Sequence, residues 1–179
     1  MARNQVVLEA AFKVFSKFGY KKASMSDIAQ SAGISRPTLY ALYPDKESVF
    51  SALIEQTIEQ NISETSRRIE GVKDLDSKLR HVLDVWIIEP YSAAMETENG
   101  SEMVLGASLY APVAMNRLWK EFEREVASVL ELGMRKNGVS AKELAIIFVS
   151  SCRDFKASAK SVRELKKSTE ILLSLANSL

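Results

Sequence analysis

Histidine and cysteine are almost absent from the sequence, which leaves few side chains that could bind zinc or act as the base beside a nucleophile. The 179 residues include one histidine, His81, and one cysteine, Cys152. A zinc site takes several His or Cys ligands, and these two residues would form the sole cysteine–histidine pair. Cys152 lies in an apolar helical pattern, where a cysteine is usually a small buried hydrophobe. Glycine-rich phosphate loops and the Gly-x-Ser-x-Gly motif are also missing. We therefore expect no enzyme activity, no metal and no cofactor.

A single cysteine cannot form an intrachain disulfide, so the sequence gives no reason to expect an oxidising compartment. The strongly apolar run at residues 145–149 is far shorter than the ~20 residues that cross a membrane as a helix. The first residues lack the long apolar stretch of a signal peptide. We expect a cytoplasmic protein.

Proline and glycine are scarce as well, at four and seven residues. Because no alternating run of Val, Ile and Thr indicates a strand, and Ala, Leu, Glu and Lys are frequent, the composition favours helix throughout. The length suits one domain or a small head on a larger body. The net charge is +1 overall, with +3 over residues 1–50 and −2 over the rest. A basic N-terminal part fits DNA binding at that end of the chain.

Residues 24–46, SMSDIAQSAGISRPTLYALYPDK, predict two short helices joined by a tight turn. Ser24 can cap the first helix with Asp27 as its reciprocal partner, and Ser35 can cap the second. Gly33 supplies the left-handed residue that ends the first helix. The small Ala29 allows close approach, and three aliphatic residues fill the angle between the helices, namely Ile34, Leu39 and Leu42. Two helices that cross at roughly 90–120° through such a turn form a helix-turn-helix.

The second of these helices offers Arg36, Thr38 and Tyr40 outward, and its first turn tolerates Pro37 because the amides there lack intrahelical partners. A guanidinium, a hydroxyl and a phenol at a helix N-terminus suit base edges and phosphates. An ordinary helical hairpin with a solvated polar face is the alternative.

Residues 8–53, LEAAFKVFSKFGYKKASMSDIAQSAGISRPTLYALYPDKESVFSAL, resemble the TetR family of one-component bacterial transcriptional regulators. The resemblance implies an all-α homodimer, with an N-terminal three-helix helix-turn-helix head and a C-terminal helical bundle that dimerises. It places a DNA-binding domain at residues 1–46 and an effector-binding and dimerisation domain at residues 47–179. Leu42 and Tyr43 stand where relatives often carry His and Phe, so base contacts at the end of the recognition helix stay open.

Lys46 lies in the first turn of the next helix, where the helix dipole opposes a cation, so stability alone does not favour it. A phosphate would reverse that argument, because the helix amides and the ammonium would both face it. The resemblance implies this same role. The residues that we expect to contact bases or the DNA backbone are Ser24, Ser26, Arg36, Pro37, Thr38, Tyr40, Tyr43 and Lys46.

Apolar residues spaced three and four apart predict further helices beyond the head. They cover residues 46–70, then 74 or 76 to about 90, 102–110 and 113–136, with a loop over 91–101 and a stop at Asn137-Gly138. Two capping boxes, Ser140 with Glu143 and Ser161 with Glu164, begin the last two helices, over 141–157 and 162–177.

These last two helices carry wide apolar stripes, and we predict that they form the dimer interface as half of a four-helix bundle packed at about 20°. The alternative is that the stripes close the subunit's own core. The residues assigned to the interface are Leu144, Ile147, Phe148, Phe155, Leu165, Leu172 and Leu175.

Both tryptophans lie between residues 75 and 122, together with several Met and Tyr residues. Such side chains can line an adaptable apolar pocket, although core packing explains the same residues. The resemblance implies an effector pocket here, with Trp86, Tyr91, Met95, Met103, Tyr110, Trp119 and Phe122 as its lining.

These interpretations predict a sequence-specific transcriptional regulator that binds duplex DNA as a homodimer. We expect a repressor that a small apolar effector of unknown identity releases from an inverted-repeat operator. The alternative function is a helical protein-interaction adaptor without DNA binding.

Overall fold

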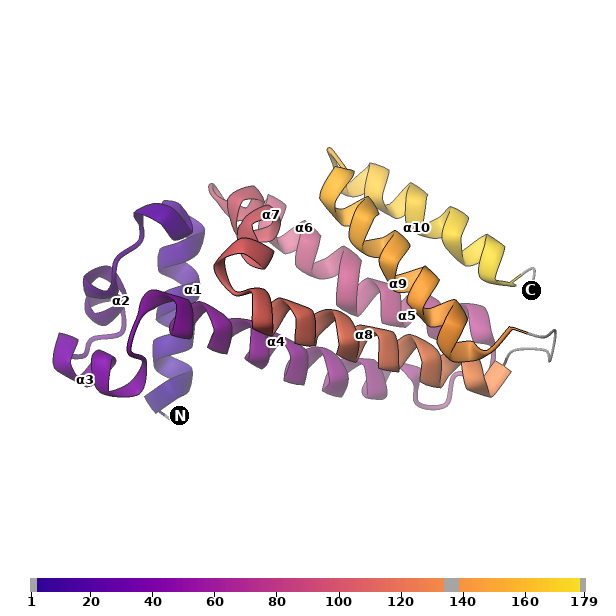
Figure 1. Cartoon of the computed structure of the whole chain (residues 1–179), viewed down its shortest axis with the longest axis horizontal. Helices are drawn as coiled ribbons and strands as arrows, with labels where there is room; N and C mark the ends of the chain where they lie inside the picture. Colours follow the sequence, from indigo (N-terminus) through magenta and orange to yellow (C-terminus); the bar gives the residue numbers. More distant parts are fainter. Residues whose placement is uncertain (1–2, 134–138, 178–179) are drawn as a thin grey trace. The chain divides into compact units, whose positions relative to one another are not determined.

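The computed structural model describes residues 3–133 and 139–177, and these residues form α-helices and one π-helical segment, with no strand among them (Figure 1). The prediction of an all-α fold is therefore confirmed. The elements are α1 (Arg3–Lys22), α2 (Met25–Ser31), α3 (Arg36–Leu42), α4 (Lys46–Ile69), α5 (Leu75–Leu83), η1 (Asp84–Ile88), α6 (Glu89–Met95), α7 (Gly100–Tyr110), α8 (Pro112–Gly133), α9 (Ala141–Ser158) and α10 (Val162–Asn177). No helix in the described ranges is both long and apolar enough to span a bilayer.

The chain forms two compact units that differ from a simple division along the sequence. The first unit comprises Met1–Thr57 and Ala93–Arg117, and the second comprises Ile58–Ser92 and Leu118–Leu179. Helices α4, α6 and α8 therefore contribute residues to both units. The boundary after residue 46 is a division by function, and it stays a prediction.

The first unit is built around α1, which packs against α2 and α7. Its helical dihedrals are interrupted at Gly19, where φ is +76° and ψ is 160°. This change of direction places Tyr20 in an aromatic cluster. The ring of Tyr20 stacks on Tyr110 of α7 with centroids 4.0 Å apart, and it meets Phe50 of α4 at 5.1 Å. Phe15 is fully buried beneath them.

Side-chain caps fix several helix ends at the predicted places. Both reciprocal hydrogen bonds of a capping box are present between Ser24 and Asp27 at α2 and between Ser140 and Glu143 at α9. At α10 the box is incomplete. The amide of Glu164 donates to Ser161, but the Glu164 carboxylate accepts from the Lys160 amide instead.

The prediction that a helix ends near Pro90, followed by a loop over 91–101, is wrong for most of that stretch. Helix continues through η1 and α6 to Met95, and α7 begins at Gly100. A proline inside an α-helix loses one hydrogen bond and pushes its ring against the carbonyl four residues earlier. Here the chain widens into a π turn, in which the Glu89 amide donates to the Asp84 carbonyl. The wider turn accommodates the proline without ending the helix. The predicted stop at Asn137-Gly138 lies outside the described residues.

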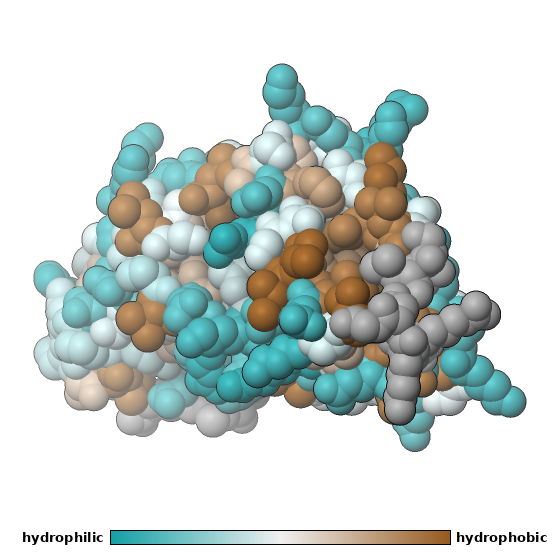
Figure 2. Space-filling view, turned by 45° about the vertical axis from the view of Figure 1, so that its right-hand side comes forward, coloured by the Kyte–Doolittle hydropathy of each residue, from teal (hydrophilic) through white to brown (hydrophobic). Residues whose placement is uncertain are grey.

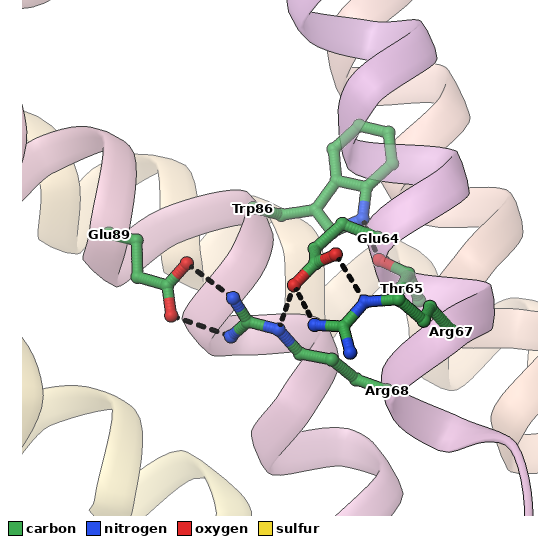
Figure 3. A network of polar contacts seen from close by, with 6 residues as sticks. All are labelled: Glu64, Thr65, Arg67, Arg68, Trp86 and Glu89. Atoms are coloured by element: carbon green, nitrogen blue, oxygen red, sulfur yellow. Dashed lines mark hydrogen bonds and ion pairs between the residues drawn. The ribbon is translucent and has the colours of Figure 1, made fainter.

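A polar network in the second unit links the end of α4 to the start of α6 (Figure 3). Arg68 donates to Glu64 on its own helix and, with two nitrogens, to the carboxylate of Glu89 at 2.6 and 3.0 Å. Hydrogen bonds from Arg67 and Arg68 lower the pKa of Glu64 to about 2. Beside this exposed network, the indole of the buried Trp86 donates to the Thr65 hydroxyl at 2.9 Å. Since a buried donor without an acceptor is costly, this bond fixes how the indole can pack.

Candidate nucleic-acid interface

The turn between α2 and α3 has the geometry that the sequence predicts. Gly33 has φ of +65°, a left-handed conformation that an L side chain rarely adopts. The amide of Gly33 donates to the Gln30 carbonyl, and the amide of Ile34 donates to the Ala29 carbonyl. This pair of bonds is a Schellman motif, which satisfies the last carbonyls of α2 and turns the chain toward α3.

Helix α3 has one buried anchor and a polar outer surface. Leu39 is fully buried, whereas Arg36 and Pro37 are exposed and 44% of Tyr40 is accessible. Ser35 caps the helix by accepting from the Thr38 amide at 3.3 Å, and the two hydroxyls lie 2.8 Å apart. The guanidinium and the phenol are therefore free to meet a ligand, while the Thr38 hydroxyl already shares a hydrogen bond.

The predicted backbone-contacting residues differ in how available they are. Ser24 and Ser26 lie exposed at the start of α2, but the Ser24 hydroxyl is 2.5 Å from Asp27 and is held by the capping box. Tyr43 is half-buried at the end of α3, and burial raises its pKa. Its phenol stays protonated at neutral pH and keeps its capacity to donate to a phosphate oxygen.

Lys46 stabilises the end of α1, a role that the sequence analysis did not predict. Its ammonium donates to the carbonyls of Tyr20, Lys21 and Ala23 at 2.6, 3.3 and 2.9 Å, and it lies 4.5 Å from the Tyr20 ring centroid. A lysine at the end of a helix satisfies carbonyls and interacts well with the dipole. Lys46 begins α4 but stabilises the end of α1, so the expectation that stability does not favour a cation here is wrong. The break at Gly19 is the sequence signal that could have indicated it.

The three donors of the Lys46 ammonium match three carbonyl acceptors, so a direct phosphate bond requires that one of them is given up. The charge itself remains, and it can attract a phosphate without a direct bond.

The predicted effector-pocket residues are divided between the two units, with Met95, Met103 and Tyr110 in the first and Trp86, Tyr91, Trp119 and Phe122 in the second. Several are engaged in packing. Trp86 and Phe122 are buried and stack at 5.5 Å, the Tyr91 hydroxyl donates to the Ala159 carbonyl, and the Tyr110 hydroxyl donates to Glu102. Two cavities, of about 170 and 270 Å³, are lined by none of these seven residues.

The residues predicted for the dimer interface separate into two groups by burial. Leu144, Phe148 and Leu165 are buried within the subunit, so for these three the alternative of a closed subunit core is correct. Phe155 and Leu172 are partly exposed. Figure 2 shows apolar side chains, in brown, exposed on the face that it draws. The exposed apolar residues of α9 and α10 are Ile146, Ile147, Ile171 and Leu175.

A turn anchored by Gly33, a buried Leu39 and an outward-facing Arg36 define a helix-turn-helix DNA-binding head. Residues 7–53 match the family of bacterial regulatory proteins, tetR family. The chain is similar to this TetR family over these residues.

A curated relative matches about two thirds of the chain. The chain is 27% identical over 117 residues to an uncharacterized HTH-type transcriptional regulator, YvdT, of Bacillus subtilis (strain 168); the match covers 65% of this chain and 56% of YvdT. The match thus spans about half the length of that regulator.

Solved structures share the fold over almost the whole chain. A TetR transcription regulator from Haloarcula marismortui is 14% identical with a TM-score of 0.76, covering 99% of this chain and 97% of that one. FadR of Thermus thermophilus, a TetR-family repressor in complex with lauroyl-CoA, is 20% identical with a TM-score of 0.65, covering 95% and 93%.

We expect replacement of Lys46 by methionine to lower the free energy of unfolding by about 1.5–3 kcal/mol, the usual contribution of hydrogen bonds to a charged group. The carbonyls at the end of α1 lose their shared donor in this variant. Urea denaturation followed by circular dichroism measures the change.

Lys22→Met is the matched control, because Lys22 is an exposed lysine at the end of α1, next to the carbonyls that Lys46 bonds. The control should change stability by less than about 0.5 kcal/mol. Equal stability of the two variants would contradict the structural role of Lys46.

Proposed function

We propose that the protein is a DNA-binding transcriptional regulator that reads an inverted repeat as a homodimer. The observation that carries this proposal is the polar outer surface of α3, with Arg36 and Tyr40 exposed and Leu39 buried. The match of residues 7–53 to the TetR family supports it. A protein-interaction adaptor needs no such combination of a fixed turn, an exposed guanidinium and a neighbouring lysine.

Arg36, Thr38 and Tyr40 are the residues that we assign to bases or adjacent phosphates, with Ser26 at the start of α2. Arginine recognises guanine through two parallel hydrogen bonds, and a phenol or hydroxyl suits either a base edge or a phosphate. The residues assigned to the DNA backbone are Ser24, Pro37, Tyr43 and Lys46, the last through its charge.

A single head of this kind buries only about 600–1,000 Å² on DNA. Two heads related by a twofold axis combine their contacts, and a palindromic operator matches that symmetry.

Arg36→Ala should weaken binding to the preferred operator by about 1–3 kcal/mol and relax base preference at one position. The operator is first selected from a pool of random duplexes with the unmodified protein. Titration of the selected and a scrambled duplex at several salt concentrations then gives affinity, preference and the salt slope, which is about −0.9 per phosphate neutralised.

Arg163→Ala is the control, because Arg163 is an exposed arginine of α10. It should leave both affinity and preference unchanged. Absence of saturable, salt-dependent binding by the unmodified protein would favour the adaptor function instead.

We assign the dimer interface to the exposed apolar residues of α9 and α10. Ile147 of α9 and Ile171 of α10 are 61% and 55% exposed, so both can contact a second copy. Their helices pack against each other, so two copies can form a four-helix bundle.

The double variant Ile147→Glu, Ile171→Glu should sediment as a folded monomer, because charges are costly in an apolar interface. Leu109→Glu, Val113→Glu is the matched control, since both residues are exposed on other helices, and this variant should remain dimeric. A dimeric Ile147, Ile171 variant would exclude this surface. Substitution of Phe148 is uninformative because its side chain is buried in the subunit.

We further propose that a small, largely apolar effector binds within residues 47–179 and releases the protein from DNA. The FadR structure with lauroyl-CoA supports an acylated effector as the first to test. A coupling free energy of ~1–3 kcal/mol would lower DNA affinity about 5- to 150-fold.

Lauroyl-CoA titrated into the protein–operator complex should therefore raise the dissociation constant for DNA by at least about fivefold. Free CoA is the control for the nucleotide part of the ligand. If lauroyl-CoA quenches tryptophan fluorescence but leaves DNA affinity unchanged, the ligand binds without regulating.

A further inference from the structure

A cavity of about 170 Å³ lies in the second unit, where α5 and η1 meet α10. Its apolar lining consists of Leu83, Ile88 and Leu173, all nearly inaccessible to solvent. Its polar lining consists of Arg80, Asp84, Lys166, Thr169 and Glu170. A cavity of about 150 Å³ can hold a benzene molecule, so this one is large enough for a small organic ligand.

Most polar groups of this cavity already have partners. Arg80 is bonded to the carboxylates of Asp76 and Glu170, which links α5 to α10. The Thr169 hydroxyl donates to carbonyls of its own helix, at Leu165 and Lys166. Neither group needs a ligand to satisfy it.

Asp84 differs from these groups. Among the residues that the structure describes, its carboxylate accepts no hydrogen bond and joins no ion pair, although the side chain is only partly exposed. Burial raises the pKa of Asp84, and repulsion from Glu89 raises it further. Lys166, Arg68 and His81 act in the opposite direction but do not reverse the shift. A positive charge at this carboxylate would remove both penalties.

The position of Asp84 in the chain is also unusual. It is the first residue of η1, and its carbonyl accepts the wide π-type hydrogen bond from the Glu89 amide. Single π turns within helices are rare and occur frequently at functional sites. An unpaired carboxylate, an adjacent cavity and a π turn thus coincide at one residue.

We propose that this cavity binds a small organic amine whose ammonium pairs with Asp84 and whose apolar body lies against Leu83, Ile88 and Leu173. An anion is disfavoured, because Arg80 is already occupied by two carboxylates and the carboxylate of Asp84 would repel it. The apolar part is about the size of one aromatic ring. Its lining shares no residue with the predicted effector-pocket lining or with the residues assigned to DNA.

Benzylamine is a suitable probe, and benzyl alcohol is its neutral analogue of the same shape. Isothermal titration of the full chain at low salt should give saturable one-site binding of benzylamine. Benzyl alcohol should bind about tenfold or more weakly, because it lacks the charge-assisted bond to the carboxylate.

Asp84→Asn should remove this preference for the amine, and Asp154→Asn should not, because Asp154 is an exposed aspartate of α9 outside the cavity. Lys166→Met should tighten benzylamine binding about two- to threefold, since it removes a like charge near the ligand. Tighter benzylamine binding by Lys166→Met together with a lost amine preference in Asp84→Asn cannot both arise from damaged folding.

Asp84→Asn should stay folded, because it removes a carboxylate whose charged form the fold disfavours, and its thermal unfolding midpoint reports this. Three results would overturn the proposal: no saturable benzylamine binding to the unmodified protein, equal binding of the amine and the alcohol, or a full amine preference in Asp84→Asn. Titration of the same variants with operator DNA does not depend on benzylamine binding. If the amine site is refuted, the proposed DNA-binding function is therefore unaffected.

Discussion

The ammonium of Lys46 is the interaction on which the geometry of the head depends. It bonds three carbonyls at the end of α1, and the same residue begins α4. Because α1 ends at Lys22, those carbonyls lack the amides that a longer helix would supply. One cation at the start of α4 therefore satisfies the carbonyls at the end of α1. The helix-turn-helix lies between these two points in the chain, so its ends are held by a single side chain.

This arrangement also limits what Lys46 can do on DNA. An ammonium has three hydrogens, and all of them already have acceptors in the protein. In the proposed DNA complex, Lys46 would then act on the phosphates through its electrostatic field, which salt screens, and not through a fixed bond. Arg36 is in the opposite situation, because it is exposed at the first position of α3. The proposal therefore gives the structural role to Lys46, whose ammonium is fully bonded, and the recognition role to the exposed Arg36.

Local signals in the sequence predicted the head and the helix ends well, because caps and turns depend on residues only a few positions apart. Ser24 with Asp27, Gly33, and Ser140 with Glu143 all act as expected. Pro90 misled the prediction, since whether a helix stops at a proline depends on the preceding turn, and a π turn has no short sequence signature. Phe148 misled it in another way. An apolar stripe shows that a face is covered but not whether the cover comes from the same subunit.

The same limit applies to the candidate sites. Trp86 is a residue type that often lines ligand pockets. Its contacts with Thr65 and Phe122, however, are those of a packed core. Asp84 gave no signal at all, because a lone aspartate between Leu83 and Val85 gains its meaning only when α10 closes the cavity beside it. Long-range pairing decides such cases, and the spacing of residues along one helix cannot reveal it.

Helix α4 shows how an event in the second unit can reach the head through the chain itself. The helix is continuous from Lys46, whose ammonium holds the end of α1, to Arg68, which is bonded to Glu89. Thr65 on the same helix holds the indole of Trp86. A change in packing around Trp86 or Glu89 must therefore either break these bonds or move the end of α4. Because an α-helix is a stiffer connection than a loop, the effector mechanism proposed above would act through α4, the helix that begins at Lys46.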